Sequence, residues 1–187
     1  MPLAFPSVGI QNIEMRLKRA VAVSESPFSY EQQVYEHQGA RWECEVTLSP
    51  LSYAEARSVQ AFIVALKGQS GTFTFGHPLT TTTSKTVTSS GTTAIRAEQI
   101  SCSSNSSSIV AGTYFQIGDY LYLCTEDKAA GTAPIKFQPP LRAAVTSGTA
   151  LDFTNPKSLW RMASNDIGWK TDTASIYGFT FAFVEAL

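Results

Sequence analysis

Charge is scarce in this sequence of 187 residues. Charged side chains make up 16% of the chain, against about a quarter in a typical soluble domain, and the formal net charge is -1. Proteins that bind nucleic acid usually carry a basic patch. Here Lys and Arg are scattered, and the longest basic run is Arg16-Leu17-Lys18-Arg19. The composition therefore argues against a nucleic-acid partner.

Cysteine and histidine are also rare. The three cysteines are Cys44, Cys102 and Cys124, and no pair has C-x-x-C spacing, which argues against a disulfide framework or a zinc site. Cys44 and Cys124 lie in alternating strand patterns, where cysteine acts as a small hydrophobic residue. We expect Cys102, in a serine-rich stretch, to be exposed. His37 is the one base that a Cys44 nucleophile would have nearby in the sequence.

Motifs for cofactor binding and hydrolysis are missing. The sequence contains no phosphate-binding loop, dinucleotide fingerprint, G-x-S-x-G or H-E-x-x-H motif. Asp119, Glu126 and Asp127 lack the ligand density of a calcium loop. His77 lies in a G-H-P turn, where a solvated or turn-capping histidine is expected. We therefore predict no catalytic residue, no cofactor and no metal.

Long apolar runs are missing as well. No run approaches the roughly 18 residues of a membrane-spanning helix. The N-terminal "MPLAFPSVGIQN" lacks a basic start, and two prolines interrupt its apolar residues, which argues against a secretion signal. We expect no membrane span and synthesis in the cytosol.

The sequence does contain several stretches with the alternation that is typical of β-strands. Residues 10–18 and 41–48 alternate between apolar and polar side chains, and residues 32–38 do so more weakly. In 41–48 the side chains expected to face inward are Trp42, Cys44, Val46 and Leu48. The closing stretch 176–184 is apolar on both faces, so this strand is predicted to be central or covered by a partner.

One helix is predicted, over about 52–67. Ser52 and Glu55 have capping-box spacing at its start, and Gly68 supplies a stop. An apolar stripe at helical spacing is formed by Val59, Phe62, Ile63 and Leu66. A short strand with Phe73 and Phe75 on one face follows.

Composition changes abruptly after Pro78. Stretches such as "TTTTSKTVTSSGTT" read either as surface loops or as short strands of a small β domain. Gly118-Asp119 is a turn signal between two β-rich runs. We predict a core formed by 1–78 with 158–187, and an inserted Ser/Thr-rich β domain over 79–157.

The stretch "RWECEVTLSPLSYAEARSVQAFIVALKGQSGTFTFGHP" resembles the distal tail proteins of long-tailed bacteriophages and the lambda-type minor tail protein M family. The shared pattern is a strand ending in Thr-Leu, a helix that ends at a glycine, and a G-x-F-x-F strand followed by proline. The C-terminal "YGFTFAFVEAL" resembles the closing strand of the same fold, and the region from "GDYLYLCTED" to "LWRM" resembles a subgroup with an inserted β domain.

The resemblance implies a β-barrel or sandwich of tail-tube type with one packed helix. It also implies a ring, of six subunits, at the distal end of the tail between the tail tube protein and the hub or tip proteins. The chain would then belong to the virion and be made in the host cytoplasm. We predict a subunit interface at Phe73, Phe75, His77, Tyr177 and Phe179.

Two other classes of function stay open at this point. A carbohydrate-binding β module would use aromatic side chains of the insertion as a platform, namely Tyr114, Phe115, Tyr120 and Tyr122. Exposure of these rings would support it. A thiol or metal-dependent enzyme would use Cys44 and His37.

Overall fold

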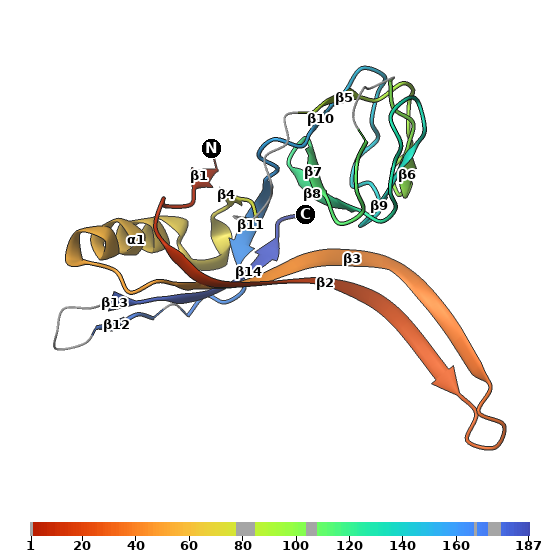
Figure 1. Ribbon diagram of the computed structural model, residues 1–187. Helices are drawn as coiled ribbons and strands as arrows, with labels where there is room; N and C mark the ends of the chain where they lie inside the picture. Colours follow the sequence, from red (N-terminus) through yellow and green to blue (C-terminus); the bar gives the residue numbers. More distant parts are fainter. Residues whose placement is uncertain (1, 78–84, 104–107, 167, 172–176) are drawn as a thin grey trace.

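The computed structural model describes residues 2–77, 85–103, 108–166, 168–171 and 177–187. It is 48% strand and 10% helical, and this part of the chain contains one α-helix, α1 (Tyr53–Leu66). The prediction of a mainly β fold with one packed helix is confirmed. Figure 1 shows two separate β layers, with α1 packed beside the first.

The first sheet combines both ends of the chain. Its strand order is β1-β4-β11-β14-β3-β2, in which only β1 and β4 pair in parallel. The strands are β1 Leu3–Ala4, β2 Ile10–Glu25, β3 Gln32–Leu48, β4 Phe73–Phe75, β11 Ser158–Met162 and β14 Thr180–Glu185. The closing strand β14 is central, between β11 and β3, as its two apolar faces predicted.

The second sheet uses only residues between 86 and 152. Its order is β5-β10-β7-β8-β9-β6. The strands are β5 Thr86–Thr88, β6 Gln99–Ile100, β7 Tyr114–Ile117, β8 Tyr120–Cys124, β9 Ile135–Gln138 and β10 Ala150–Asp152. The predicted turn joins β7 to β8, and Gly118 has a φ of 59° there, which glycine adopts without strain. A two-stranded pair, β12 (Lys170–Thr171) and β13 (Tyr177–Gly178), completes the topology.

Helix α1 forms where its sequence signals place it. The Glu55 carboxylate accepts hydrogen bonds from the backbone N–H of Ser52 (3.0 Å) and from its hydroxyl (2.7 Å), so the predicted cap is present. Lys67, one residue before the predicted glycine stop, already adopts a left-handed φ of 53°. The short 3-10 helix η1 (Gly68–Ser70) follows.

The main core lies between α1 and the first sheet. All four stripe residues of α1 are buried against strand residues, as predicted. The sheet contributes the predicted inward set of β3, together with Phe73, Trp160, Phe181 and Phe183. Leu121 of β8 is also part of this cluster, so the second sheet packs directly on the first.

A separate core fills the second sheet. It contains Phe115, Tyr122, Phe137 and Phe153, and also Cys102 and Cys124. The expectation that Cys102 would be exposed is wrong, because its side chain is 1% exposed. A serine-rich stretch can still place one apolar side chain inward. Here the backbone of Cys102 forms an isolated antiparallel β-bridge with that of Ser89.

Candidate assembly surfaces

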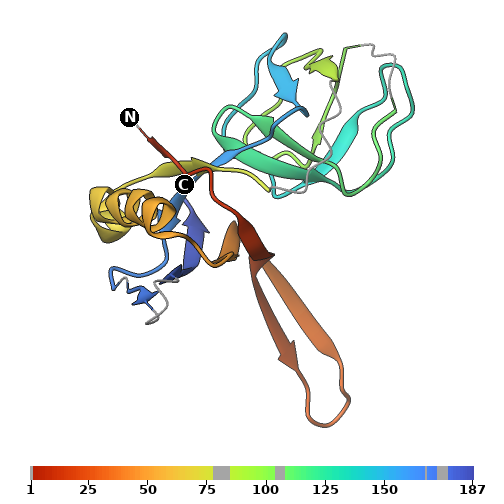
Figure 2. The same cartoon turned by 60° about the vertical axis from the view of Figure 1, so that its left-hand side comes forward.

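The longest strands of the protein extend beyond its body. β2 and β3 were predicted as segments 10–18, 32–38 and 41–48, but the structure joins them into one continuous hairpin from Ile10 to Leu48. β14 pairs only with residues 43–47 of β3. Residues 19–40, here called the arm, therefore form a two-stranded ribbon. Its base borders the insertion, and its outer part projects away from both cores (Figures 1 and 2).

The arm exposes apolar side chains on both faces. Val23 and Val34 are direct cross-strand partners on one face, with Val21 beside them. Tyr35 lies on the other face, where its ring contacts that of His37 at 4.7 Å between centroids. All of these valines and Tyr35 are exposed. A two-stranded ribbon without a packed layer is marginally stable in water, and exposed apolar clusters mark contact sites.

The tip of the arm is a defined turn. Ser26 N–H donates to the Glu31 carbonyl at 3.0 Å, and Tyr30 N–H donates to the Ser26 carbonyl at 2.9 Å. Tyr30 has a φ of 57°, a left-handed conformation that is uncommon for a bulky residue. Phe28 is 95% exposed and Tyr30 is 74% exposed. The turn therefore holds two aromatic side chains at the far end of the ribbon.

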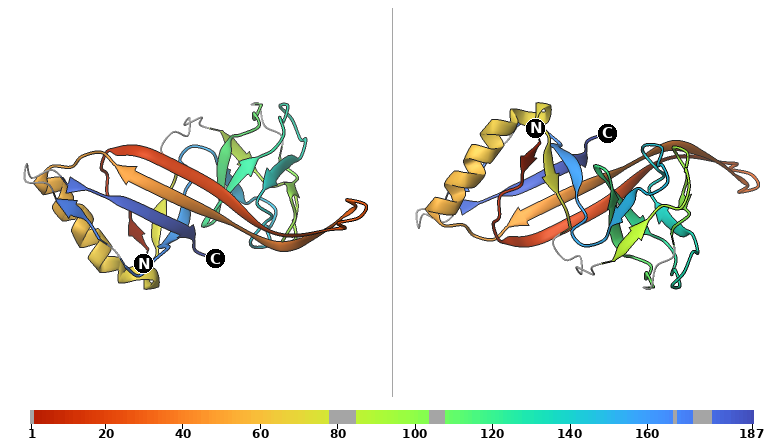
Figure 3. Two further views of the ribbon diagram at one scale, coloured as in Figure 1. Left: turned by 90° about the horizontal axis from the view of Figure 1, so that it is seen from below. Right: turned by 90° about the horizontal axis from the view of Figure 1, so that it is seen from above.

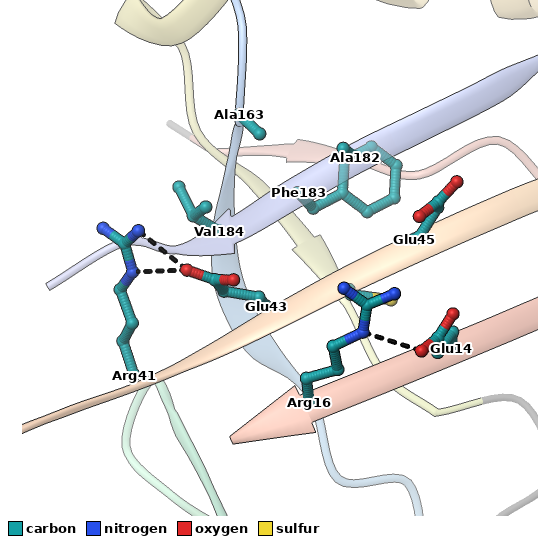
Figure 4. Close-up of a pocket in the computed structure, with 10 residues that line it drawn as sticks. Glu14, Arg16, Arg41, Glu43, Glu45, Ala163, Ala182, Phe183 and Val184 are labelled. Atoms are coloured by element: carbon teal, nitrogen blue, oxygen red, sulfur yellow. Dashed lines mark hydrogen bonds and ion pairs between the residues drawn. The ribbon is translucent and has the colours of Figure 1, made fainter. Parts of the chain in front are cut away.

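Charged side chains line the outer face of β2 and β3 (Figure 4). Glu14 is opposite Glu45, Arg16 is opposite Glu43, and Lys18 is opposite Arg41. The acidic side chains therefore gather at one end and the basic ones at the other, around a shallow hollow of about 210 Å³.

Three ion pairs between described residues lie on this charged face, and the one between Lys18 and Glu43 is the longest at 3.6 Å. Arg16 donates to Glu14 at 2.7 Å, and this hydrogen bond lowers the pKa of Glu14 and raises the pKa of Arg16. Arg41 donates to Glu43 at 2.7 Å and lowers the pKa of that carboxyl group. Viewed from below, these strands lie in front with no described element across them (Figure 3). The face is open for contact, although exposed ion pairs add little stability by themselves.

An apolar cleft lies at the open end of the β2–β3 hairpin, opposite the tip of the arm. Its volume is about 620 Å³. The lining residues come from β2, β3, the β12–β13 region and the start of β14, namely Gln11, Thr47, Leu48, Pro50, Gly168, Trp169, Tyr177, Gly178, Phe179 and Thr180. Trp169 is 43% exposed.

Buried polar contacts hold the second sheet to the first. The indole N–H of Trp42 donates to the Leu121 carbonyl at 2.9 Å. Arg142 donates to the Glu185 carboxylate at 2.7 Å, and the same carboxylate accepts the backbone N–H of Trp42 at 3.0 Å. The Tyr122 hydroxyl accepts the Arg142 backbone N–H at 3.1 Å. The insertion is thus fixed on the body by specific contacts.

The predicted interface residues are not together on the surface. Phe73, Phe75 and Phe179 are buried in the main core. Tyr177 lines the cleft, and His77 stacks on Tyr114 with ring centroids 5.5 Å apart. Desolvation lowers the pKa of His77. Period-two aromatic residues in this chain mostly build the core, but Tyr177 and Phe179 of the predicted set also line the cleft.

The four rings of the predicted carbohydrate platform are also divided. Phe115 and Tyr122 are buried in the second core, where burial raises the pKa of Tyr122 to about 12. Tyr114 and Tyr120 are only half-buried. The rings therefore do not form one exposed platform on the chain.

The Cys44–His37 pair does not form. The two residues are seven positions apart on one extended strand, which separates them by roughly 23 Å. Burial raises the pKa of Cys44 to about 12, so its thiol is far from a reactive thiolate. Among the described residues, no group of three or more His, Cys, Asp or Glu side chains could hold a metal ion. Asp127 instead accepts the Ala111 N–H at 2.7 Å.

No protein-family model and no curated protein sequence matches this chain. In the part of the chain that the structure describes, no helix is long and apolar enough to cross a membrane. The resemblance to tail-tip proteins stays a prediction from the residues quoted above.

The arm is the surface that sequence reasoning missed. Its signal was present in "VAVSESPFSYEQQVY", where two β-favouring runs flank a turn-forming Ser-Pro stretch. The polar alternation of these runs is weak because neither face is buried. Alternation between an inward and an outward face therefore predicts the part of each strand that belongs to the main sheet, but does not predict the arm.

Proposed function

We propose that this chain is a structural subunit of a ring at the distal end of a long-tailed phage tail. The ring would join the tail tube to the tip or baseplate hub, and its subunits would contact each other and these two neighbours. The residue patterns that resemble the distal tail and minor tail proteins support this role, as does the mainly β fold with one packed helix. The mature ring would belong to the virion.

The observation that carries the proposal is the arm. The outer part of this ribbon has apolar side chains on both faces and two exposed aromatic residues at its tip, and none of the described residues forms a layer over those side chains. Such a ribbon is expected in a subunit that completes its packing through assembly. The open charged face of the first sheet supplies a second, more polar contact area.

The test is the native mass and particle shape of the purified chain. Light scattering over a concentration series should give a mass of several subunits, six by the resemblance, and negative-stain images should show rings with a central channel. Chemical cross-linking of the same sample should stop at the same number of subunits. A compact monomer at every concentration, with no ring in the images, would contradict the proposal.

A further inference from the structure

The arm tip has the properties of a preformed binding element. Besides the two backbone hydrogen bonds across the turn, the Ser26 hydroxyl accepts the N–H groups of Phe28 and Ser29 at 3.4 Å. Gln32 donates to Glu25 at 2.6 Å across the base of the turn. The left-handed Tyr30 is held in place by these contacts. Strained residues of this kind cluster at functional sites.

The exposed aromatic area of the arm is large enough for a real interface. At roughly 150–250 Å² per aromatic side chain, the exposed parts of Phe28, Tyr30 and Tyr35 provide on the order of 400 Å². This is half of the about 800 Å² that each partner of a stable interface buries. The exposed valines of the arm add to this area.

The cleft beside Trp169 is the matching feature. Its volume of about 620 Å³ falls within the roughly 300–1,000 Å³ of pockets that bury whole ligands, so it has room for an aromatic tip. Trp169 and Tyr177 provide aromatic surface there, and the described residues that line the cleft include no charged side chain.

The tip and the cleft of one chain cannot meet. The cleft is lined by Gln11, Thr47 and Leu48 at the open end of the β2–β3 hairpin, and the tip is at the other end of this extended ribbon (Figures 1 and 3). β2 alone has 16 residues, which at about 3.3 Å per residue span roughly 50 Å. The strands are continuous, so the arm cannot fold back onto the body. Any contact between the two features must join two molecules.

We propose that the arm tip of one copy inserts Phe28 into the cleft of a second copy, next to Trp169. The occupant of the cleft is therefore this same chain, arranged head to tail. Each copy keeps a free tip and a free cleft for further neighbours, so the contact repeats until it closes into a ring or extends as a filament. The inference specifies a contact of the proposed ring and rests on that function.

Two variants test the contact from its two sides. Phe28→Ser removes the tip, and Trp169→Ser removes part of the cleft. Val110→Ser, at an exposed position on the insertion, is the matched control. Circular dichroism should show that all three fold. In analytical ultracentrifugation, each of the first two variants should associate at least tenfold more weakly than the wild type, and Val110→Ser should not.

Mixing the two defective variants tests the head-to-tail order. The Trp169→Ser chain keeps an intact tip, and the Phe28→Ser chain keeps an intact cleft. One productive contact is then possible for each pair, so the mixture should stop at a 1:1 dimer. A mixture that stays monomeric, or a symmetric contact that survives in either variant alone, would overturn the proposal.

Trp169 also provides an optical readout. Trp42 and Trp160 are buried, so acrylamide quenching of tryptophan fluorescence reports mainly on Trp169. Quenching should fall as the wild-type concentration rises and should stay constant for Phe28→Ser. Constant quenching in an associating wild type would show that the cleft remains open, against the proposal.

The outcomes separate this contact from the proposed function. Rings that persist in Phe28→Ser would overturn the tip contact and leave the ring subunit standing. Filaments or dimers that need Phe28, with no ring, would support the contact and count against the ring. A wild-type monomer at all concentrations would contradict both.

Discussion

Arg142 and Glu185 form an ion pair of 2.7 Å between the two sheets, and the Glu185 side chain is completely buried. The second carboxylate oxygen of Glu185 and the Nε of Arg142 have no hydrogen-bond partner in the described structure. Burying charge costs free energy that pairing only partly offsets. The pair therefore fixes the position of the insertion at some cost in stability.

Glu185→Gln should destabilise the protein by about 3 kcal/mol, because it leaves Arg142 without its counter-charge in a buried setting. Urea unfolding followed by circular dichroism measures the loss. Glu31→Gln, on the exposed turn of the arm, should change stability by less than about 0.5 kcal/mol. If both substitutions changed the free energy of unfolding equally, the buried ion pair would not contribute to stability.

Gly76→Ala should destabilise the junction between the body and the insertion. An added Cβ would lie 2.3 Å from the Pro156 carbonyl oxygen, so the backbone must shift. Overpacking of this kind costs about 1–3 kcal/mol. Differential scanning calorimetry should show a lower Tm. Gly91→Ala, where a Cβ meets nothing within 4 Å, is the control, and a Tm loss as large at Gly91 would contradict the argument.

The three thiols should be protected in the folded protein. All are buried, and burial raises the pKa of Cys44 and Cys124 to about 12. At pH 8 a thiol of that pKa is ionised in roughly one molecule in 10⁴. A thiol-specific colour reagent at pH 8 should therefore react with three groups only after denaturant is added. Fast reaction of one thiol in the native protein would contradict this prediction and would support the hypothesis of a thiol-dependent enzyme.

Ser52→Ala should weaken the start of α1 by about 1 kcal/mol, the usual value of a helix cap. Ser58→Ala, inside the same helix, should be near neutral because alanine favours helix. Both variants lose a serine hydroxyl, but only Ser52→Ala loses the cap. The difference between their thermal unfolding temperatures at pH 7 therefore measures the contribution of the cap.

The Ser52 cap should also depend on pH. Hydrogen bonds from the Ser52 hydroxyl and backbone N–H lower the pKa of Glu55 from 4.5. A lowered folded pKa stabilises the protein above pH 4.5, and this contribution is lost as the pH falls through the folded value. The stability difference between wild type and Ser52→Ala should therefore shrink in acid. A constant difference down to pH 3 would show that the carboxylate is not part of the cap.

Elements with one buried face were predictable from the sequence. The inward set of β3 and the stripe of α1 follow directly from periods of two and 3.6 residues. The Ser52–Glu55 cap is a local signal, and the central position of β14 was one of the two alternatives predicted from its apolar residues.

Features that depend on contacts across the chain were not predictable. The burial of Glu185 is one such feature, because its partner Arg142 is 43 residues away in the sequence. Phe73, Phe75 and Phe179 were assigned to an interface, but all three are buried in the main core, and of these only Phe179 also lines the cleft. Tip and cleft likewise became visible only as two ends of one hairpin.

The continuity of β2 and β3 gives the arm a mechanical property. The arm has no hinge loop, since the strands that form it also form part of the main sheet. A sideways force on the tip is therefore transmitted through the backbone into the sheet that borders the core. The register shift between Arg19 and Val21 is the irregularity in the pairing at the base of the arm, and bending would concentrate there. In a ring built through such arms, a displacement of one subunit would be felt by its neighbour's core.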